Sequence, residues 1–234
     1  MTKILGHTGN AVYLGHFQGN AMKHFLDIVE EYSMNKVTIS PRVSVITNYT
    51  QKEQAITALQ LELSNMPYVN ACPEETQKWS NVNKIKNYVD ALEKTTSEYS
   101  LLVDGYDVLF FRDIDDEFIE RFNEINKKIL FNATKNNHPN FDIDFVEQRD
   151  DLGEFKYLNA GVVFGRTEDL LSFYKEVLEL TQKDNIMNPW QSEQLYVRMA
   201  ANGKEDIAFD YECNLFQTFS KANKTICGNT VIIY

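Results

Sequence analysis

The chain has 234 residues, of which 43% are hydrophobic and 12% aromatic, which is enough for one large domain with a substantial core. Its net charge of −11 argues against a nucleic-acid partner, because no basic stripe is present to neutralise phosphates. The sequence contains no apolar run of about 20 residues and no signal-peptide pattern at its start, so we expect a cytoplasmic protein without a membrane span.

The first 40 residues differ from the rest of the chain. We expect residues 1–40 to form an extension or cap, with an amphipathic helix near residues 21–33, followed by one domain over residues 41–234. His7 and His16 lie in a glycine-containing stretch of this segment. Surface or packing roles are the favoured interpretation for both histidines, because no third ligand is spaced to join them at a metal.

From residue 43 onward, strand-like and helix-like segments alternate. VSVIT (43–47) has the pattern of a buried strand. Thr50 and Glu53 form a capping-box pattern, which predicts that a helix starts there and ends before Pro67. The apolar stripe of this helix is expected to consist of Ile56, Leu59 and Leu63.

The rest of the chain continues the alternation. We expect four more helices: one over residues 81–94, one that starts at the acidic run 113–117, one from 167 to about 183, and one over 192–202. Strands are expected at 99–103, 129–134, 157–165 and 207–210, and a hairpin around Gly228 and Asn229. This order predicts an α/β fold with a mostly parallel central sheet flanked by helices and a C-terminal hairpin.

Two aspartates interrupt the apolar stretch LLVDGYDVLFF at residues 101–111. Asp104 ends the predicted strand, and Asp107 follows a turn that Gly105 permits. Because ligands gather at the carboxyl ends of parallel strands, the two carboxylates are placed to bind one divalent cation such as Mn²⁺ or Mg²⁺. The alternative is an ordinary turn, since Asp-Gly is a common turn pair.

Four segments, in the same order, resemble a known family. LLVDGYDVLF (101–110) resembles the metal-binding motif in the glycosyltransferase domain of procollagen lysyl hydroxylases and related procollagen glycosyltransferases. KYLNAGVVFG (156–165) is similar to the family's Y-L-N-S-G-x-x-x-G segment, and IAFDYECNLFQTF (207–219) to its L-D-x-x-x-x-I-F-Q segment. SEQLYV (192–197) stands where the family has Asp-Asp-Gln. The resemblance covers roughly residues 43 to 220.

The resemblance implies a GT-A fold that transfers glucose or galactose from a UDP-sugar, through Mn²⁺, to a hydroxyl acceptor of the hydroxylysine type or on a glycan. It implies that Asp104 and Asp107 bind the metal, that Tyr106 packs on the uracil ring, and that Lys84 approaches the donor. The remaining residues that it assigns are Thr47, Asn48 and Tyr49 in the nucleotide pocket and Asn159 in the sugar and acceptor cleft.

The sequence also departs from the family. Ser192, Glu193 and Gln194 replace Asp-Asp-Gln, so Glu193 is the candidate carboxylate near the reacting sugar, with Gln194 beside it. A helix start capped by Ser192 explains these residues equally well. Asp210 ends a short predicted strand and is a catalytic candidate, which would hold cleft residues or orient the acceptor; a structural hydrogen bond is the alternative.

The family's third metal ligand is a histidine in an H-G-N-G segment beyond the F-Q element, and the chain reaches Tyr234 without one. Either the chain is truncated before this histidine, or another residue or water completes the site. The altered acidic pair and the missing histidine support an alternative interpretation, in which the chain is a non-catalytic GT-A-like domain that binds a nucleotide-sugar or acts as a scaffold.

Overall fold

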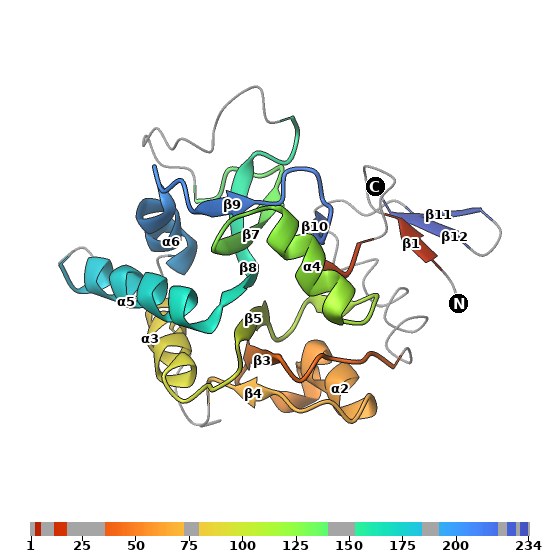
Figure 1. Ribbon diagram of the computed structural model, residues 1–234, viewed down its shortest axis with the longest axis horizontal. Helices are drawn as coiled ribbons and strands as arrows, with labels where there is room; N and C mark the ends of the chain where they lie inside the picture. The colour runs from red at the N-terminus through yellow and green to blue at the C-terminus, as the bar shows by residue number, and fades with distance from the viewer. Residues whose placement is uncertain are drawn as a thin grey trace.

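The computed structural model describes residues 3–5, 12–17, 36–72, 80–139, 153–183, 192–219, 224–227 and 230–233. A six-stranded sheet with the order β4-β3-β5-β8-β7-β9 forms its centre (Figure 1). These strands are β3 (Val43–Asn48), β4 (Val69–Asn70), β5 (Tyr99–Asp104), β7 (Ile129–Thr134), β8 (Tyr157–Arg166) and β9 (Ile207–Phe209). Only β8 runs antiparallel to its neighbours, so the predicted mostly parallel sheet is confirmed.

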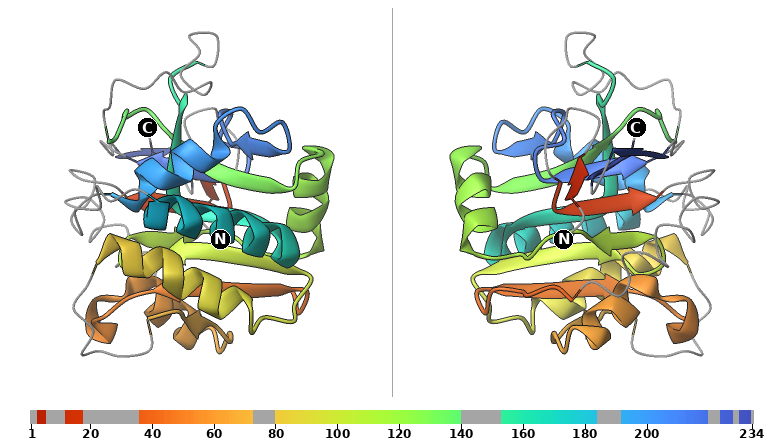
Figure 2. Two further views of the ribbon diagram at one scale, coloured as in Figure 1. Left: turned by 90° about the vertical axis from the view of Figure 1, so that its left-hand side faces the viewer. Right: turned by 90° about the vertical axis from the view of Figure 1, so that its right-hand side faces the viewer.

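Both faces of this sheet are covered. Helices α3 (Asn81–Leu92), α5 (Thr167–Lys183) and α6 (Glu193–Ala201) pack on one face, whereas α4 (Asp116–Glu124) covers the other (Figure 2). Each face of the sheet has its own hydrophobic core, because successive side chains of β5 point to opposite faces. Leu102 packs with α3, α5 and α6, while Leu101 and Val103 pack on the α4 side.

A second, three-stranded sheet has the order β10-β2-β6. It consists of β2 (Leu14–Phe17), β6 (Val108–Phe110) and β10 (Phe216–Phe219). Strand β2 is parallel to β10 and antiparallel to β6, and residues 12–17 are all buried. This part of the N-terminal segment therefore packs inside the α/β core. The helix expected near residues 21–33 and His7 lie outside the described residues.

The predicted C-terminal hairpin is confirmed. Strands β11 (Lys224–Cys227) and β12 (Thr230–Ile233) pair antiparallel, and β1 (Lys3–Leu5) pairs parallel with β12. Among the described helices, none combines the length and the apolar character that crossing a bilayer requires.

Side chains cap three of the predicted helices at their starts. The side chain of Ser80 caps α3, Asp115 caps α4 and Ser192 caps α6, each by accepting a hydrogen bond from a backbone N–H in the first turn. On α3, Ile85 and Val89 are buried against the sheet core.

The prediction for the helix after β3 is wrong in two respects. A short 3-10 turn, η2 (Lys52–Gln54), precedes α2 (Ile56–Leu63), and no side chain caps either element. Two of the three residues of the expected apolar stripe also point outward, since Leu59 is 36% and Leu63 is 52% exposed, whereas Ile56 is half-buried.

Polar contacts explain the orientation of α2. Thr57 Oγ1 donates to the carbonyl oxygens of Asp104 and Val108, at 2.9 and 2.8 Å. The amide of Gln60 bonds both the N–H and the carbonyl of Phe110, at 2.9 and 2.8 Å. These bonds satisfy backbone groups of the motif segment, so α2 buries the face that carries Thr57 and Gln60, together with Ala58 and Leu61.

Candidate functional site

The turn between β5 and β6 brings two carboxylates to the carboxyl end of the sheet. Asp104 is the last residue of β5, and Asp107 immediately precedes β6. A methyl group on Gly105 would lie 2.9 Å from both the Asn48 carbonyl oxygen and the Tyr49 Cβ atom. Glycine is therefore required for the turn to approach the end of β3 so closely.

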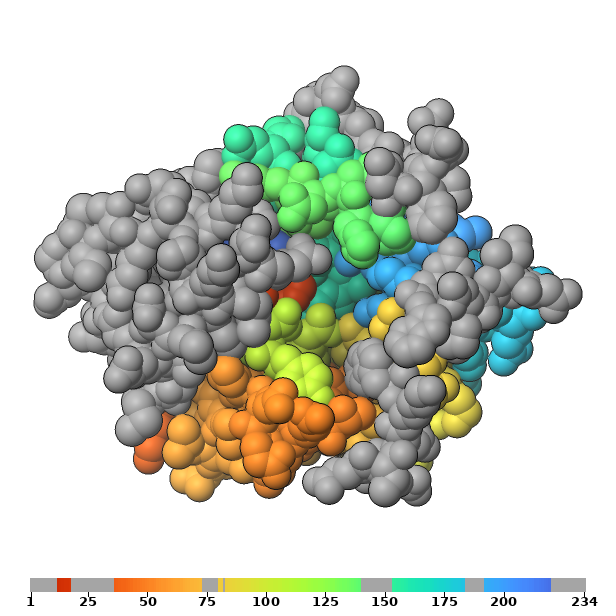
Figure 3. Space-filling view, turned by 180° about the vertical axis from the view of Figure 1, so that it is seen from behind, coloured from red at the N-terminus to blue at the C-terminus, as the bar shows by residue number. Residues whose placement is uncertain are grey.

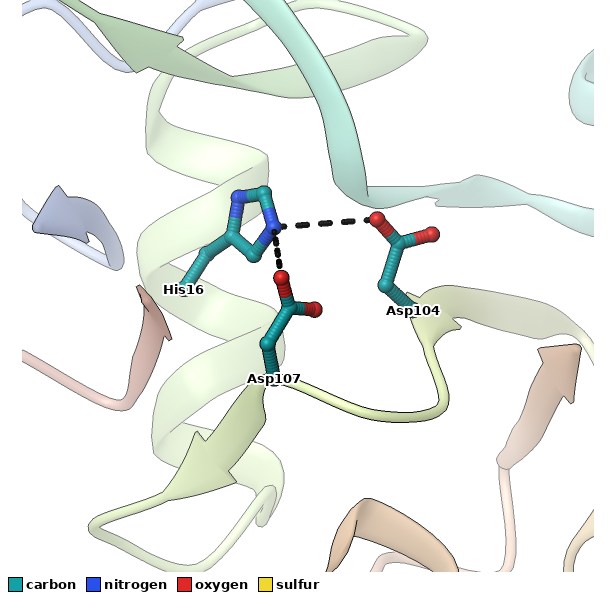
Figure 4. Close-up of side chains that lie close together, drawn as sticks. All are labelled: His16, Asp104 and Asp107. Atoms are coloured by element: carbon teal, nitrogen blue, oxygen red, sulfur yellow. Dashed lines mark ion pairs between the residues drawn. The ribbon is translucent and has the colours of Figure 1, made fainter. Parts of the chain in front are cut away.

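Strand β2 adds a histidine to the two aspartates. His16 stands opposite Val108 in the β2–β6 pairing, and Phe17 N–H donates to the Asp107 carbonyl at 2.8 Å. The Nε2 atom of His16 lies 3.3 Å from Asp107 Oδ2 and 3.6 Å from Asp104 Oδ2 (Figure 4). One ligand atom from each of the three residues lies within 4.8 Å of the others, which is an arrangement that can hold a metal ion.

The favoured sequence interpretation of His16 did not foresee this arrangement. His16 is 3% exposed, but its imidazole faces two carboxylates rather than serving only to pack the core. The available signal was the short apolar run VYLGHF at residues 12–17, in which one histidine interrupts a strand-like pattern.

Charge around His16 favours its protonated form in the absence of a metal. Burial lowers the pKa of His16, but the charge of Asp107, the hydrogen bond to it and the charge of Asp104 together raise the pKa above its ordinary value. For Asp104, burial raises the pKa, while the Lys84 ammonium opposes this rise.

Lys84 connects the motif to helix α6. Its Nζ lies 2.5 Å from Asp104 Oδ1 and 2.7 Å from Glu193 Oε1, and its side chain is only 5% exposed. Burial lowers the pKa of Lys84, but the charges of Asp104 and Glu193 outweigh burial and raise it well above the ordinary value. The ammonium therefore stays charged and bonds Glu193, which lies 109 positions further along the chain.

A cavity of about 510 Å³ opens beside these charges. Figure 3 shows a hollow where β2, the motif turn, β8 and α6 meet. The cavity is lined by His16, Asn81, Asp104, Asp107, His138, Pro139, Asn159, Gly161, Ser192, Glu193 and Gln194. Asn81, His138 and Gly161 were not singled out from the sequence, because nothing local to them indicates a shared cavity.

Two predicted cleft residues use their amide groups on neighbouring backbone. Asn159 Oδ1 accepts from Gly161 N–H at 2.9 Å. Gln194 Oε1 accepts from Ala160 N–H at 3.1 Å, and its Nε2 donates to the His138 carbonyl. Both side chains therefore hold the cavity wall in addition to lining it.

The residues predicted for the nucleotide pocket gather beside the motif. Asn48 pairs with Asp104 in the β3–β5 register. Thr47 Oγ1 and both amide atoms of Asn48 are buried without a hydrogen-bond partner in the described part of the chain. The Tyr106 hydroxyl accepts from the backbone N–H of Thr50 at 2.8 Å, which fixes the ring next to Tyr49 in one apolar cluster.

Asp210 is not among the residues that line the cavity. Its carboxylate accepts backbone hydrogen bonds from Asn214, Leu215 and Phe216, at 2.9, 2.7 and 2.7 Å. Burial raises the pKa of Asp210, and these three bonds oppose the rise. This geometry favours the structural hydrogen-bonding role over the catalytic one.

Comparison with known families gives a match that covers most of the chain. Residues 75–229, more than half of the chain, match the PLOD GT domain family. The chain belongs to this family. The matched range of the PLOD GT domain includes Asp104, Asp107 and Glu193 but not His16. The observed α/β fold has the mostly parallel central sheet flanked by helices that was predicted from the sequence.

Solved structures give more distant likenesses. A glycosyltransferase involved in the glycosylation of the major capsid of PBCV-1 is 14% identical, with a TM-score of 0.44 over 72% of this chain and 82% of that chain. The glycosyltransferase GlyE of Streptococcus pneumoniae is 12% identical, with a TM-score of 0.38 over 75% of this chain and 45% of that chain. The 4-diphosphocytidyl-2C-methyl-D-erythritol synthase of Anaerococcus prevotii is 12% identical, with a TM-score of 0.35 over 75% of this chain and 89% of that chain. These likenesses are too distant to assign a substrate, and no curated protein sequence matches significantly.

Proposed function

We propose that this chain is a metal-dependent glycosyltransferase that moves glucose or galactose from a UDP-sugar to a hydroxyl group on a peptide or glycan. The observation that carries the proposal is the convergence of His16, Asp104 and Asp107 on the wall of a cavity in a PLOD GT domain. The cavity volume, about 510 Å³, suits a ligand of this size, since small-molecule sites span about 300–1,000 Å³.

The three side chains fit a divalent transition metal. Carboxylate oxygens suit Mn²⁺ and Mg²⁺, and an imidazole nitrogen favours Mn²⁺ over Mg²⁺, which prefers an oxygen shell. When bound, the ion would supply a Lewis acid that neutralises charge growing on the leaving diphosphate, an effect worth several kcal/mol.

Lys84 orients the metal-binding carboxylate. It holds Oδ1 of Asp104, while Oδ2 of the same carboxylate faces His16 Nε2. Its buried positive charge also offsets two of the nearby acids, in a protein whose net charge of −11 would otherwise repel a diphosphate.

The nucleotide is proposed to bind at the carboxyl end of β3. Thr47 and Asn48 offer buried polar atoms without partners in the described residues, and such atoms cost free energy until a ligand pairs with them. Tyr49 and Tyr106 supply aromatic surface for the uracil ring.

The sugar and the acceptor hydroxyl are proposed to occupy the wall formed by Asn159, Glu193 and Gln194. Glu193 is the only one of these three that carries a charge, so it is our candidate for the carboxylate near the reacting carbon. Asp210 is left out of this proposal, because its carboxylate bonds backbone groups away from the cavity.

The alternative function is a domain that binds a nucleotide-sugar without transferring the sugar. In the described structure, Lys84 forms ion pairs with both Asp104 and Glu193, and Ser192 replaces an acid of the family motif. A domain that binds a nucleotide-sugar without transferring it would have these features as well.

The deciding experiment measures UDP release from a panel of UDP-sugars, with Mn²⁺ or with EDTA and without an added acceptor. We expect release from UDP-glucose or UDP-galactose that requires the metal. Asp90→Asn, an exposed aspartate on α3, serves as the matched control and should release UDP like the wild type. Metal-dependent UDP binding without release from any sugar would instead support the binding domain.

A further inference from the structure

The imidazole of His16 lies directly against the backbone of Gly161 in β8. A methyl group on Gly161 would lie 2.4 Å from Cε1, 2.7 Å from Nδ1 and 2.8 Å from Nε2 of His16. Carbon contacts below about 3 Å are strongly repulsive, because atoms in protein interiors already pack near van der Waals distance. His16 can therefore keep its place only if residue 161 has no side chain.

Hydrogen bonding does not fix the ring from its other edge. A metal-binding histidine usually donates its second ring nitrogen to a carboxylate or carbonyl, and that bond sets the ring plane. Nδ1 of His16 is buried and has no hydrogen-bond partner within the described ranges of the chain. Packing against Gly161 is consequently the contact available to set the direction of Nε2.

An irregularity in β8 brings Gly161 to this position. Phe131 pairs with Val163, but the next residue, Asn132, pairs with Asn159, so residues 160–162 have no partner on β7. Such bulges redirect the backbone near functional sites.

Two side chains stabilise the bulge. Asn159 Oδ1 accepts from Gly161 N–H, and Gln194 Oε1 accepts from Ala160 N–H. Residues 160–162 do not pair with β7, and these two side chains supply acceptors for the two N–H groups. Helix α6 therefore supports the surface on which the His16 ring rests.

We propose that Gly161 is a positioning residue for His16, and that the bulge at residues 160–162 is a seat that aims His16 Nε2 at the point where Asp104 and Asp107 converge. This inference rests on the proposed metal site. It assigns Asn159 and Gln194 a role in holding the seat, in addition to any contact with sugar.

The test is a double-mutant cycle on Mn²⁺ affinity, read from the electron paramagnetic resonance signal of free Mn²⁺ during titration of the purified chain. The four proteins are the wild type, Gly161→Ala, His16→Ala and the double variant. We expect Gly161→Ala to weaken Mn²⁺ binding about 10- to 100-fold, the usual range for supporting residues of metal ligands. In the His16→Ala background the added methyl group should change the affinity less than about twofold, because the ring it displaces is gone.

Gly165→Ala is the matched control on the same strand. Its methyl group would lie 2.6 Å from the Lys128 carbonyl oxygen, away from the cavity. We expect this variant to unfold at a lower temperature than the wild type while keeping wild-type Mn²⁺ affinity when folded. Equal losses of Mn²⁺ affinity in Gly165→Ala and Gly161→Ala would overturn the proposal.

The cycle separates this inference from the proposed function. Wild-type Mn²⁺ affinity in His16→Ala overturns the metal site and the inference together. A loss in His16→Ala with no loss in Gly161→Ala, or an equal effect of Gly161→Ala in both backgrounds, overturns the positioning role alone. If Gly161→Ala does not fold, a folded double variant supports the contact with the ring, and an unfolded double variant overturns it.

Discussion

Charged groups lie at both ends of strand β5, with Glu98 immediately before the strand and Asp104 as its last residue, and the two groups differ in burial. At the amino end, Glu98 pairs with Arg42 and Arg166, at 2.9 and 3.2 Å, and all three side chains are 38–48% exposed. At the carboxyl end, Asp104 pairs with Lys84, whose side chain is 5% exposed. Burial therefore differs most at the cation, since the side chains of Asp104 and Glu193 are 28% and 16% exposed.

Burial changes what an ion pair does for the protein. Exposed pairs are screened by water and salt, and they contribute little to the free energy of unfolding. Buried charges cost several kcal/mol of desolvation each, and their partners offset this cost only in part. A cluster such as Lys84, Asp104 and Glu193 is therefore better explained by what it binds than by stability.

The largest expected effect belongs to the pair of motif carboxylates. Asp104→Asn combined with Asp107→Asn should lower metal-dependent UDP release at least about 1,000-fold, because the variant loses two of the three proposed metal ligands. Initial rates with UDP-glucose and UDP-galactose at saturating Mn²⁺ measure this loss. Undiminished release would disprove the metal assignment.

Removal of Lys84 should have the next largest effect, on stability. Lys84→Met leaves Asp104 and Glu193 without their cation, and we expect the free energy of unfolding in urea to fall by about 3–5 kcal/mol. Because burial raises the pKa of such carboxylates, the folded variant holds more protons than the unfolded chain, and its stability falls as pH rises. The loss relative to the wild type should therefore be greater at pH 8 than at pH 5, and a variant as stable as the wild type at both pH values would contradict this.

Glu193→Gln should have a smaller effect, because Lys84 keeps its bond to Asp104. We expect the free energy of unfolding to fall by about 1–2 kcal/mol and UDP release to slow about tenfold or more. Urea unfolding and initial rates from one preparation separate the two effects. A stability loss as large as that of Lys84→Met would show that Glu193, not Asp104, is the main partner of the ammonium.

Glu98→Gln, at the exposed end of β5, should have the smallest effect. The hydrogen bond from Arg42 and the charges around it lower the pKa of Glu98, so its contribution to stability is present above the ordinary value of 4.5 and is lost as pH falls through the lowered pKa. Melting temperatures of the variant and the wild type should nearly coincide at pH 7 in high salt. A large difference in melting temperature that persists in high salt would show that the exposed ion pairs of Glu98 contribute to stability as the buried ones do.

Much of the fold could be predicted from the sequence because its signals are local. The caps at Ser80, Asp115 and Ser192 act within one helical turn, and the apolar run that ends at Asp104 predicts a strand with an acid at its carboxyl end. The helix after β3 was oriented wrongly, because the partners of Thr57 and Gln60 lie about 50 positions away in the chain.

The candidate site required the tertiary structure. The sequence alone determined that Asp104 and Asp107 flank a turn after a buried strand, since this depends on residues next to one another. His16 joins them only because β2 pairs with β6, about 90 positions further on, and because Gly161 in β8 leaves space for its ring. Pairings between distant strands depend on the folding of the whole sheet, and no pattern within a short window of sequence encodes them.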